Sequence, residues 1–117
     1  HRILLQPSGD DLAGRYKTED NFIIETDREG VRSVRFTTVP ASETAFAMEQ
    51  LILAYHAAYS EAEINPLMLI TCVILDLLCI HPFRNVNGRM SRLLSLLLMY
   101  KSGFNAGKYV SNSCFVQ

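Results

Sequence analysis

Residues 66–102 read PLMLITCVILDLLCI (66–80), HPFRNVNGRMSR (81–92) and LLSLLLMYKS (93–102). The first part is apolar nearly all round. Asn65 and Pro66 predict the start of a helix, because Asn is a good cap and Pro suits the first helical position. His81 ends that helix, since the proline that follows disfavours helical geometry in the residue before it. After a short polar loop, leucines recur at helical spacing. The stretch therefore predicts two core helices, 66–80 and 88–102, joined by a polar loop.

Upstream of these helices, the sequence predicts a hairpin and one more helix. Two runs rich in β-branched and aromatic residues, 22–26 and 31–36, flank a turn sequence, which indicates a small β-hairpin over 21–37. Apolar residues at helical spacing predict a third core helix over 42–60, with its opening serine as the cap. Residues 1–20 mix Gly, Pro and charge, so we expect an irregular lead-in.

Length and charge narrow the class of protein. A chain of 117 residues suffices for one compact domain, so we expect a single, mainly α domain with a central helix-loop-helix and a small hairpin. Eleven Lys and Arg against twelve Asp and Glu give a formal charge of -1, which argues against a protein that coats nucleic acid or an anionic membrane. The apolar run over 66–80 is shorter than the roughly 20 residues that span a membrane. We therefore expect neither a nucleic-acid partner nor a membrane partner.

Two features of the apolar helix call for an interpretation. Its cysteines, Cys72 and Cys79, together with Cys114, make an odd number without zinc-ligand spacing. With no signal-peptide pattern at the start of the sequence, reduced core thiols and a cytoplasmic location are the simplest interpretation. Asp76 is costly in an apolar helix unless it is paired, so we expect it to reach an Arg or to cap backbone N–H groups.

The polar loop carries the candidate chemistry. Asn87-Gly88-Arg89 opens a helix, where unpaired N–H groups and the helix dipole favour an anion. Arg89 and Arg92 project from the first turn and could both bind a polyphosphate. His81, at the other edge of the loop, titrates near neutrality and could accept a proton from an attacking hydroxyl. Each feature alone has an ordinary structural explanation, but the combination predicts phosphoryl or nucleotidyl transfer.

The order of these residues resembles the motif of the Fic (filamentation induced by cAMP) family, usually written His-Pro-Phe-x-(Asp/Glu)-Gly-Asn-Gly-Arg-x-x-Arg. Seven specified positions match in register: His81, Pro82, Phe83, Asn87, Gly88, Arg89 and Arg92. The resemblance covers roughly residues 14–110. It implies a helical domain with this loop between two central helices and a β-hairpin flap upstream.

The resemblance also implies an activity and assigns roles to residues. Most characterised members transfer AMP from ATP to a Ser, Thr or Tyr hydroxyl of a target protein, and some transfer other phosphate-containing groups. His81 would be the general base, and Phe83 would point into the core and anchor the loop. Asn87 and the backbone around Gly88 would hold the phosphate under attack, while the motif arginines, Arg89 and Arg92, would bind the outer phosphates.

The flap would hold an extended segment of the target protein by adding a strand to it. Its apolar side chains are Phe22, Ile24, Val34 and Phe36. Two interpretations stay open for these side chains, because they could equally cover the core.

The sequence departs from the family motif at Asn85 and Val86. The family's acidic residue, which resembles a Mg²⁺ ligand, is Asn85 here, and an amide should hold the metal more weakly than a carboxylate. Val86 still offers a backbone N–H, but a β-branched residue does not easily adopt positive φ, so the anion nest is reshaped if the usual Gly needs that geometry. The alternative to an enzyme is therefore a weakened or inactive Fic-like module that binds nucleotide or protein.

Regulation and assembly are left open by the sequence. Many family members carry an inhibitory helix with a Ser/Thr-x-x-x-Glu-Gly/Asn pattern, and no convincing copy occurs among these 117 residues. Inhibition could come from a partner protein or from sequence beyond Gln117. A homo-oligomer is compatible with the sequence.

Overall fold

The computed structural model describes residues 9, 11, 13–61 and 63–103. Most of the expected lead-in before residue 13, Cys114 and the C-terminal stretch from Gly107 lie outside the described residues. The elements are β1 (Phe22–Thr26), β2 (Arg32–Thr37), the 3-10 helix η2 (Ala41–Glu43), α2 (Thr44–Tyr59), α3 (Pro66–Ile80) and α4 (Asn87–Lys101). The predicted fold class, three helices with a small hairpin, is confirmed.

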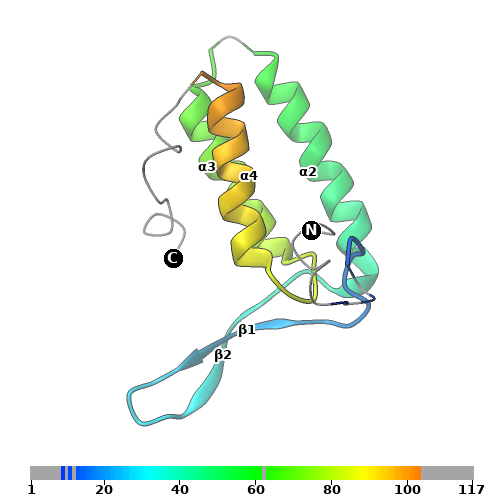
Figure 1. The fold of residues 1–117 in the computed structure, drawn as a ribbon, viewed down its shortest axis with the longest axis vertical. Coiled ribbons are helices and arrows are strands. Elements are labelled where there is room, and N and C mark those ends of the chain that lie inside the picture. Colours follow the sequence, from blue (N-terminus) through cyan, green and yellow to red (C-terminus); the bar gives the residue numbers. More distant parts are fainter. Residues whose placement is uncertain (1–8, 10, 12, 62, 104–117) are drawn as a thin grey trace.

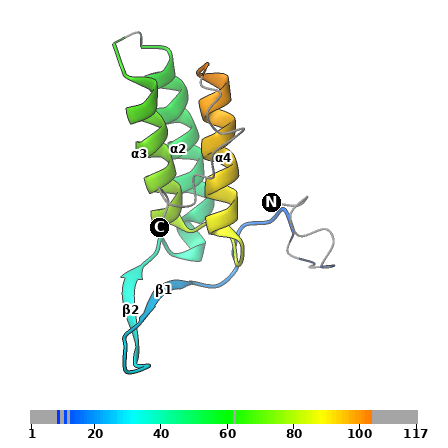
Figure 2. The same cartoon turned by 60° about the vertical axis from the view of Figure 1, so that its left-hand side comes forward.

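The three helices lie side by side, and the hairpin projects from one end of them (Figure 1). The second view shows the same separation between the hairpin and the helices (Figure 2). Helix α3 packs against both α2 and α4 and is thus the central helix. The loop between α3 and α4 lies at the end of the bundle from which the hairpin emerges, so two segments far apart in sequence meet there.

The start of α3 follows from its first residues. Asn65 accepts a hydrogen bond from the Leu67 N–H at 2.9 Å, and Pro66 occupies the first turn, where its missing N–H costs nothing. Helix α2 starts differently from the prediction. Ser42 lies within η2 and caps nothing, whereas the hydroxyl of Thr44 donates to Pro40 O at 3.0 Å.

The core is formed by one face of α3 rather than by its whole circumference. Buried apolar side chains come from α3 and α4 and are Ile70, Val73, Ile74, Leu77, Ile80 and Leu98. The opposite face of α3 exposes Met68, Leu75 and Cys72, and Leu67 is exposed in the first turn. The prediction that both cysteines of this helix are core thiols is therefore wrong for Cys72, because the apolar sequence exceeds what α2 and α4 can cover. No helix among the described residues is long and apolar enough to cross a membrane.

A buried lysine joins the lead-in, the hairpin and the end of α3. Lys17 is only 5% exposed, and its ammonium donates hydrogen bonds to four oxygens. The acceptors are Asn21 Oδ1 (2.9 Å), Thr38 Oγ1 (3.0 Å), Val39 O (2.6 Å) and Ile80 O (3.1 Å). Because Ile80 O belongs to the last turn of α3, the ammonium also neutralises the negative end of that helix dipole.

The environment of Lys17 disfavours its charge, and the hydrogen bonds compensate. Burial lowers the pKa of its ammonium, and the nearby Asp20 carboxylate opposes that effect. The backbone N–H of Lys17 donates to Pro82 O at 2.8 Å, so main chain and side chain bind the same loop. Loss of this side chain leaves several buried oxygens without donors. The free-energy cost of such unpaired oxygens exceeds the net stabilisation that the hydrogen bonds provide.

We expect Lys17→Met to lower the free energy of unfolding by about 2–4 kcal/mol, because buried carbonyls lose their donors. The matched control is Lys101→Met. The Lys101 ammonium is exposed on α4 and lies 5.2 Å from the centroid of the Tyr59 ring, an interaction worth under about 1 kcal/mol. Urea unfolding followed by circular dichroism measures both. Equal, small losses in the two variants would contradict the role given to Lys17.

Candidate active site

Two residues in the left-handed region bracket the loop between α3 and α4. His81, at the end of α3, has φ 50° and ψ 59°, and its N–H still donates to Leu77 O at 2.9 Å. Val86, at the start of α4, has φ 61° and ψ 20°. Valine does not easily adopt positive φ, but the loop holds Val86 in this geometry. The backbone geometry that a glycine would allow is thus kept at the cost of strain.

The backbone of His81-Pro82-Phe83 is fixed from the lead-in side. The amide nitrogen of Asn21 donates to His81 O at 3.3 Å and to Phe83 O at 3.2 Å. The carbonyl between them, Pro82 O, accepts from the Lys17 N–H. All three carbonyls of the tripeptide are therefore engaged by two residues that lie about sixty positions earlier in the chain.

Asn87 closes the loop from the other side. Its side chain is buried, accepts the Phe83 N–H at 3.0 Å and donates to Phe83 O at 2.7 Å. The family resemblance gives Asn87 a role in holding phosphate. In the structure its amide already shapes the loop, so the backbone N–H groups next to it are the donors best suited to a phosphate.

The first turn of α4 presents such donors. The first hydrogen bond across its start is that of Met90 N–H to Val86 O, at 2.9 Å, so the N–H groups of Gly88 and Arg89 precede it. A Cβ added at Gly88 would be 3.8 Å from Nη1 of Arg92, which places that guanidinium beside the same turn. Arg89 is exposed. The helix dipole, the N–H groups and the guanidinium together favour an anion here.

His81 is held in its neutral form. Burial is the main cause that lowers its pKa below 6.5; the Leu78 backbone carbonyl opposes that effect, and the Lys17 ammonium lowers the pKa further. Ring nitrogen Nδ1 is buried and has no hydrogen-bond partner among the described residues. A neutral imidazole at pH 7 can accept a proton, as a general base must.

Phe83 and Asn85 occupy different environments from each other. Phe83 is half-buried and packs on Tyr16 of the lead-in, with ring centroids 5.9 Å apart. Asn85 is exposed at the tip of the loop. Within the described part of the chain, no group of three His, Cys, Asp or Glu side chains could hold a metal ion.

The hairpin does not cover the core. Its expected apolar side chains are between 42% and 58% exposed: Phe22 49%, Ile24 48%, Val34 58% and Phe36 42%. The strands pair antiparallel with a bulge after Ile23, and Asp27 closes the turn by accepting the N–H groups of Glu29 and Val31. Of the two interpretations left open by the sequence, core cover is excluded, and the hairpin offers free apolar side chains at the loop end of the bundle.

Lys17 and Asn21 are site residues that the sequence did not reveal. Both lie in a segment whose composition indicates only turns, and their partners lie on the hairpin and after α3. Such long-range hydrogen bonds leave no periodic pattern in a sequence.

We expect Val86→Gly to raise the free energy of unfolding by about 0.5–1 kcal/mol, because glycine relieves the left-handed strain and this relief exceeds its extra entropy in the unfolded chain. The matched control is Val34→Gly in β2, where the backbone is extended and glycine should destabilise. Thermal unfolding measures both. Destabilisation of similar size in the two variants would show that Val86 is not strained.

Comparison with known proteins adds to this geometry. The chain resembles a solved structure of a Fic domain containing signaling protein from Bacteroides thetaiotaomicron VPI-5482, with 25% sequence identity and a TM-score of 0.70. The match covers 87% of this chain and 38% of that one, so the chain spans well under half of that protein. No match was found among curated proteins. The sequence model of the Fic/DOC family matches residues 1–99, and the chain therefore belongs to the Fic/DOC family.

Proposed function

We propose that this chain transfers AMP from ATP to a Ser, Thr or Tyr hydroxyl of a target protein. Family membership supports a Fic-type transferase. The observation that carries the proposal is a neutral His81 at one edge of a fixed loop and, at its other edge, the N–H groups of Gly88 and Arg89, which have no partner among the described residues. A base and an anion site a few residues apart are what transfer to a hydroxyl requires.

In the proposed step, the hydroxyl oxygen of the target attacks the α-phosphorus of ATP. The bond from that phosphorus to the oxygen bridging to the β-phosphate breaks, and pyrophosphate leaves with the bonding electrons. Nε2 of neutral His81 takes the hydroxyl proton. The N–H groups of Gly88 and Arg89, with the guanidinium groups of Arg89 and Arg92, stabilise negative charge on the phosphates.

A metal ion in this proposal is carried by the nucleotide. Mg²⁺ commonly takes most of its ligands from substrate phosphates and water. The amide oxygen of Asn85, exposed at the loop tip, could add one neutral ligand, whereas a carboxylate there would also offset charge. We therefore expect Asn85 to contribute little to metal binding. We also expect faster transfer once a carboxylate replaces it.

The hairpin is the proposed holder of the target segment. An extended peptide can pair with an exposed strand through its backbone. Such pairing positions the target segment without reading its side chains. The exposed Ile24 and Val34 face solvent on paired strands and offer apolar contacts to such a segment.

A second candidate is a module that binds nucleotide without turnover. Asn85 favours it, because the exposed loop tip lacks the carboxylate expected of a metal ligand. The left-handed Val86 argues against it, since the backbone at the start of α4 keeps the geometry a glycine would allow.

The test is incubation with ATP labelled on the α-phosphate, with Mg²⁺ or Mn²⁺ and a cell lysate, followed by detection of labelled protein. We expect label with the wild type and with His56→Ala, a matched control on the exposed surface of α2, and a loss of about 100-fold or more with His81→Ala. The double variant Asn85→Asp/Val86→Gly should label faster than the wild type.

The outcomes separate the two candidates. Undiminished label with His81→Ala would refute the proposed base. Absence of label with both the wild type and the restored-motif variant, while ATP still binds, would establish the non-catalytic module instead.

The lowered pKa of His81 predicts the acidic limb of the rate profile. The folded pKa lies below 6.5, so the base is neutral above that pH and is protonated as the pH falls through the folded value. The transfer rate at saturating ATP should therefore be level around neutrality and decline only below pH 6.5. A decline centred above pH 6.5 would contradict the neutral state assigned to His81.

A further inference from the structure

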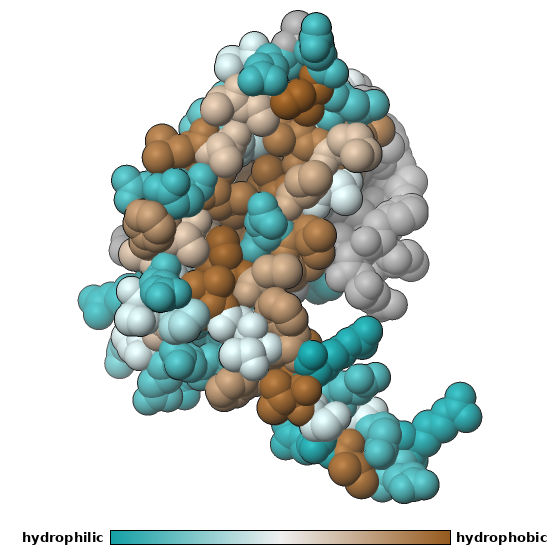
Figure 3. Space-filling model, turned by 180° about the vertical axis from the view of Figure 1, so that it is seen from behind, coloured by the Kyte–Doolittle hydropathy of each residue, from teal (hydrophilic) through white to brown (hydrophobic). Residues whose placement is uncertain are grey.

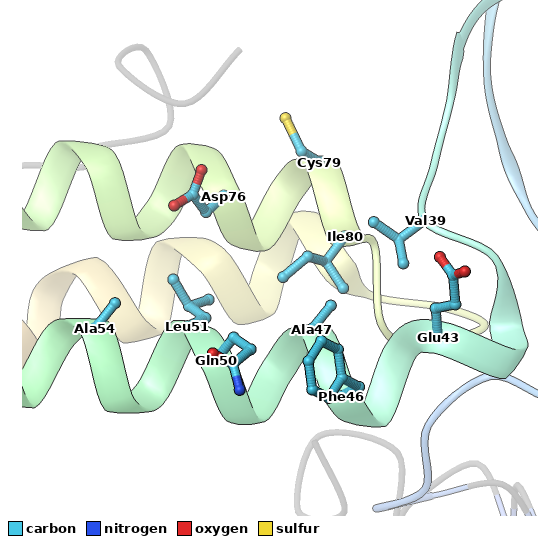
Figure 4. A pocket seen from close by; sticks show the side chains of 10 residues that line it. All are labelled: Val39, Glu43, Phe46, Ala47, Gln50, Leu51, Ala54, Asp76, Cys79 and Ile80. Atoms are coloured by element: carbon cyan, nitrogen blue, oxygen red, sulfur yellow. The ribbon is translucent and has the colours of Figure 1, made fainter.

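A groove of about 700 Å³ lies between α2 and α3 on the face away from α4 (Figures 3 and 4). The space-filling view shows an apolar band running along this face. The lining residues come from the segment before α2, from α2 itself and from the C-terminal half of α3: Val39, Glu43, Phe46, Ala47, Gln50, Leu51, Ala54, Asp76, Cys79 and Ile80. None of them is among the residues proposed for nucleotide transfer.

The α2 wall of the groove has the spacing and shape that receive another helix. Ala47, Gln50 and Ala54 recur at intervals of three and four, so they form one stripe along α2. The two alanines are small, which lets a helix approach closely, and Phe46 beside them is 66% exposed. From Ala47 to Ala54 the stripe extends about 10 Å, or about two helical turns.

The charged side chains that line the groove are both acidic. Asp76 and Glu43 are exposed lining residues, and neither carboxylate has a hydrogen bond or ion pair among the described residues. Among the residues that the structure describes, no Lys, Arg or His lines the groove. The expectation that Asp76 reaches an Arg or caps backbone groups is therefore wrong within the described chain. A lone carboxylate on a helix otherwise made of apolar residues and one Thr instead lies in the lining of the groove.

We propose that this groove binds an amphipathic α-helix of a partner protein. The apolar face of that helix lies between α2 and α3, and a Lys or Arg on its flank lies beside Asp76, with a second one beside Glu43. Apolar residues at intervals of three and four and flanking cations are the chemistry that recognises the groove. The site is separate from the loop, so it does not depend on the proposed transfer activity.

Cys79 provides a reporter for the occupied groove. It lines the groove and is half-exposed, whereas Cys72, on the same helix, is exposed and lies outside the lining. The probe is a synthetic amphipathic peptide of about 18 residues, long enough to be helical, with leucines on one face and lysines on its flanks. Alkylation rates of the two thiols, followed by mass spectrometry on the whole chain, measure protection.

We expect the lysine peptide to slow alkylation of Cys79 severalfold and saturably, while Cys72 is unaffected. Asp76→Asn and Glu43→Gln should each weaken peptide affinity about twofold to fivefold, as expected for exposed ion pairs. Glu49→Gln is the matched control, because Glu49 is an exposed carboxylate of α2 outside the groove and should leave the affinity unchanged.

Three outcomes would overturn the proposal. Equal protection by a peptide with glutamates in place of the lysines would show that apolar contact alone is responsible. Protection of Cys79 without peptide that grows with protein concentration would assign the groove to a second copy of the chain. Protection of Cys79 without peptide that does not change with protein concentration would assign the groove to another segment of the same chain.

Discussion

The ammonium group of Lys17 is the point at which the lead-in, the hairpin and the last turn of α3 meet. Its four acceptors belong to three separate segments, and its own N–H binds the loop that follows α3. A buried charge is tolerated only where such bonds satisfy it. The same charge lowers the pKa of His81, so the interaction that joins the segments also affects the chemistry of the loop.

The loop after α3 combines a rigid frame with open donors. Its carbonyls are bound by Asn21, Lys17 and Asn87, which leaves the N–H groups at the start of α4 as the side offered to an anion. Val86 carries the backbone strain of this arrangement. Preorganised donors are worth most when they need no rearrangement on binding, and a loop fixed from both sides meets that condition.

Local patterns in the sequence predicted local structure well. The cap at Asn65, the hairpin and the three helices were predicted because periodicity and turn chemistry act over a few residues. The roles of Lys17 and Asn21 were not, since their bonds reach across the chain. The exposed face of α3 also escaped prediction, because burial depends on which partners a helix finds, and the left-handed Val86 shows tertiary contacts overriding local preference.

In the proposed function, the start of α4 binds the phosphates of a nucleotide. The most direct measurement is a titration of ¹⁵N-labelled protein with ATP, followed by NMR, with adenosine as the control ligand. Saturable shifts of the Gly88 and Arg89 amide resonances are expected with ATP, and far smaller ones with adenosine. Unchanged resonances at these two residues, or equal shifts with adenosine, would contradict it.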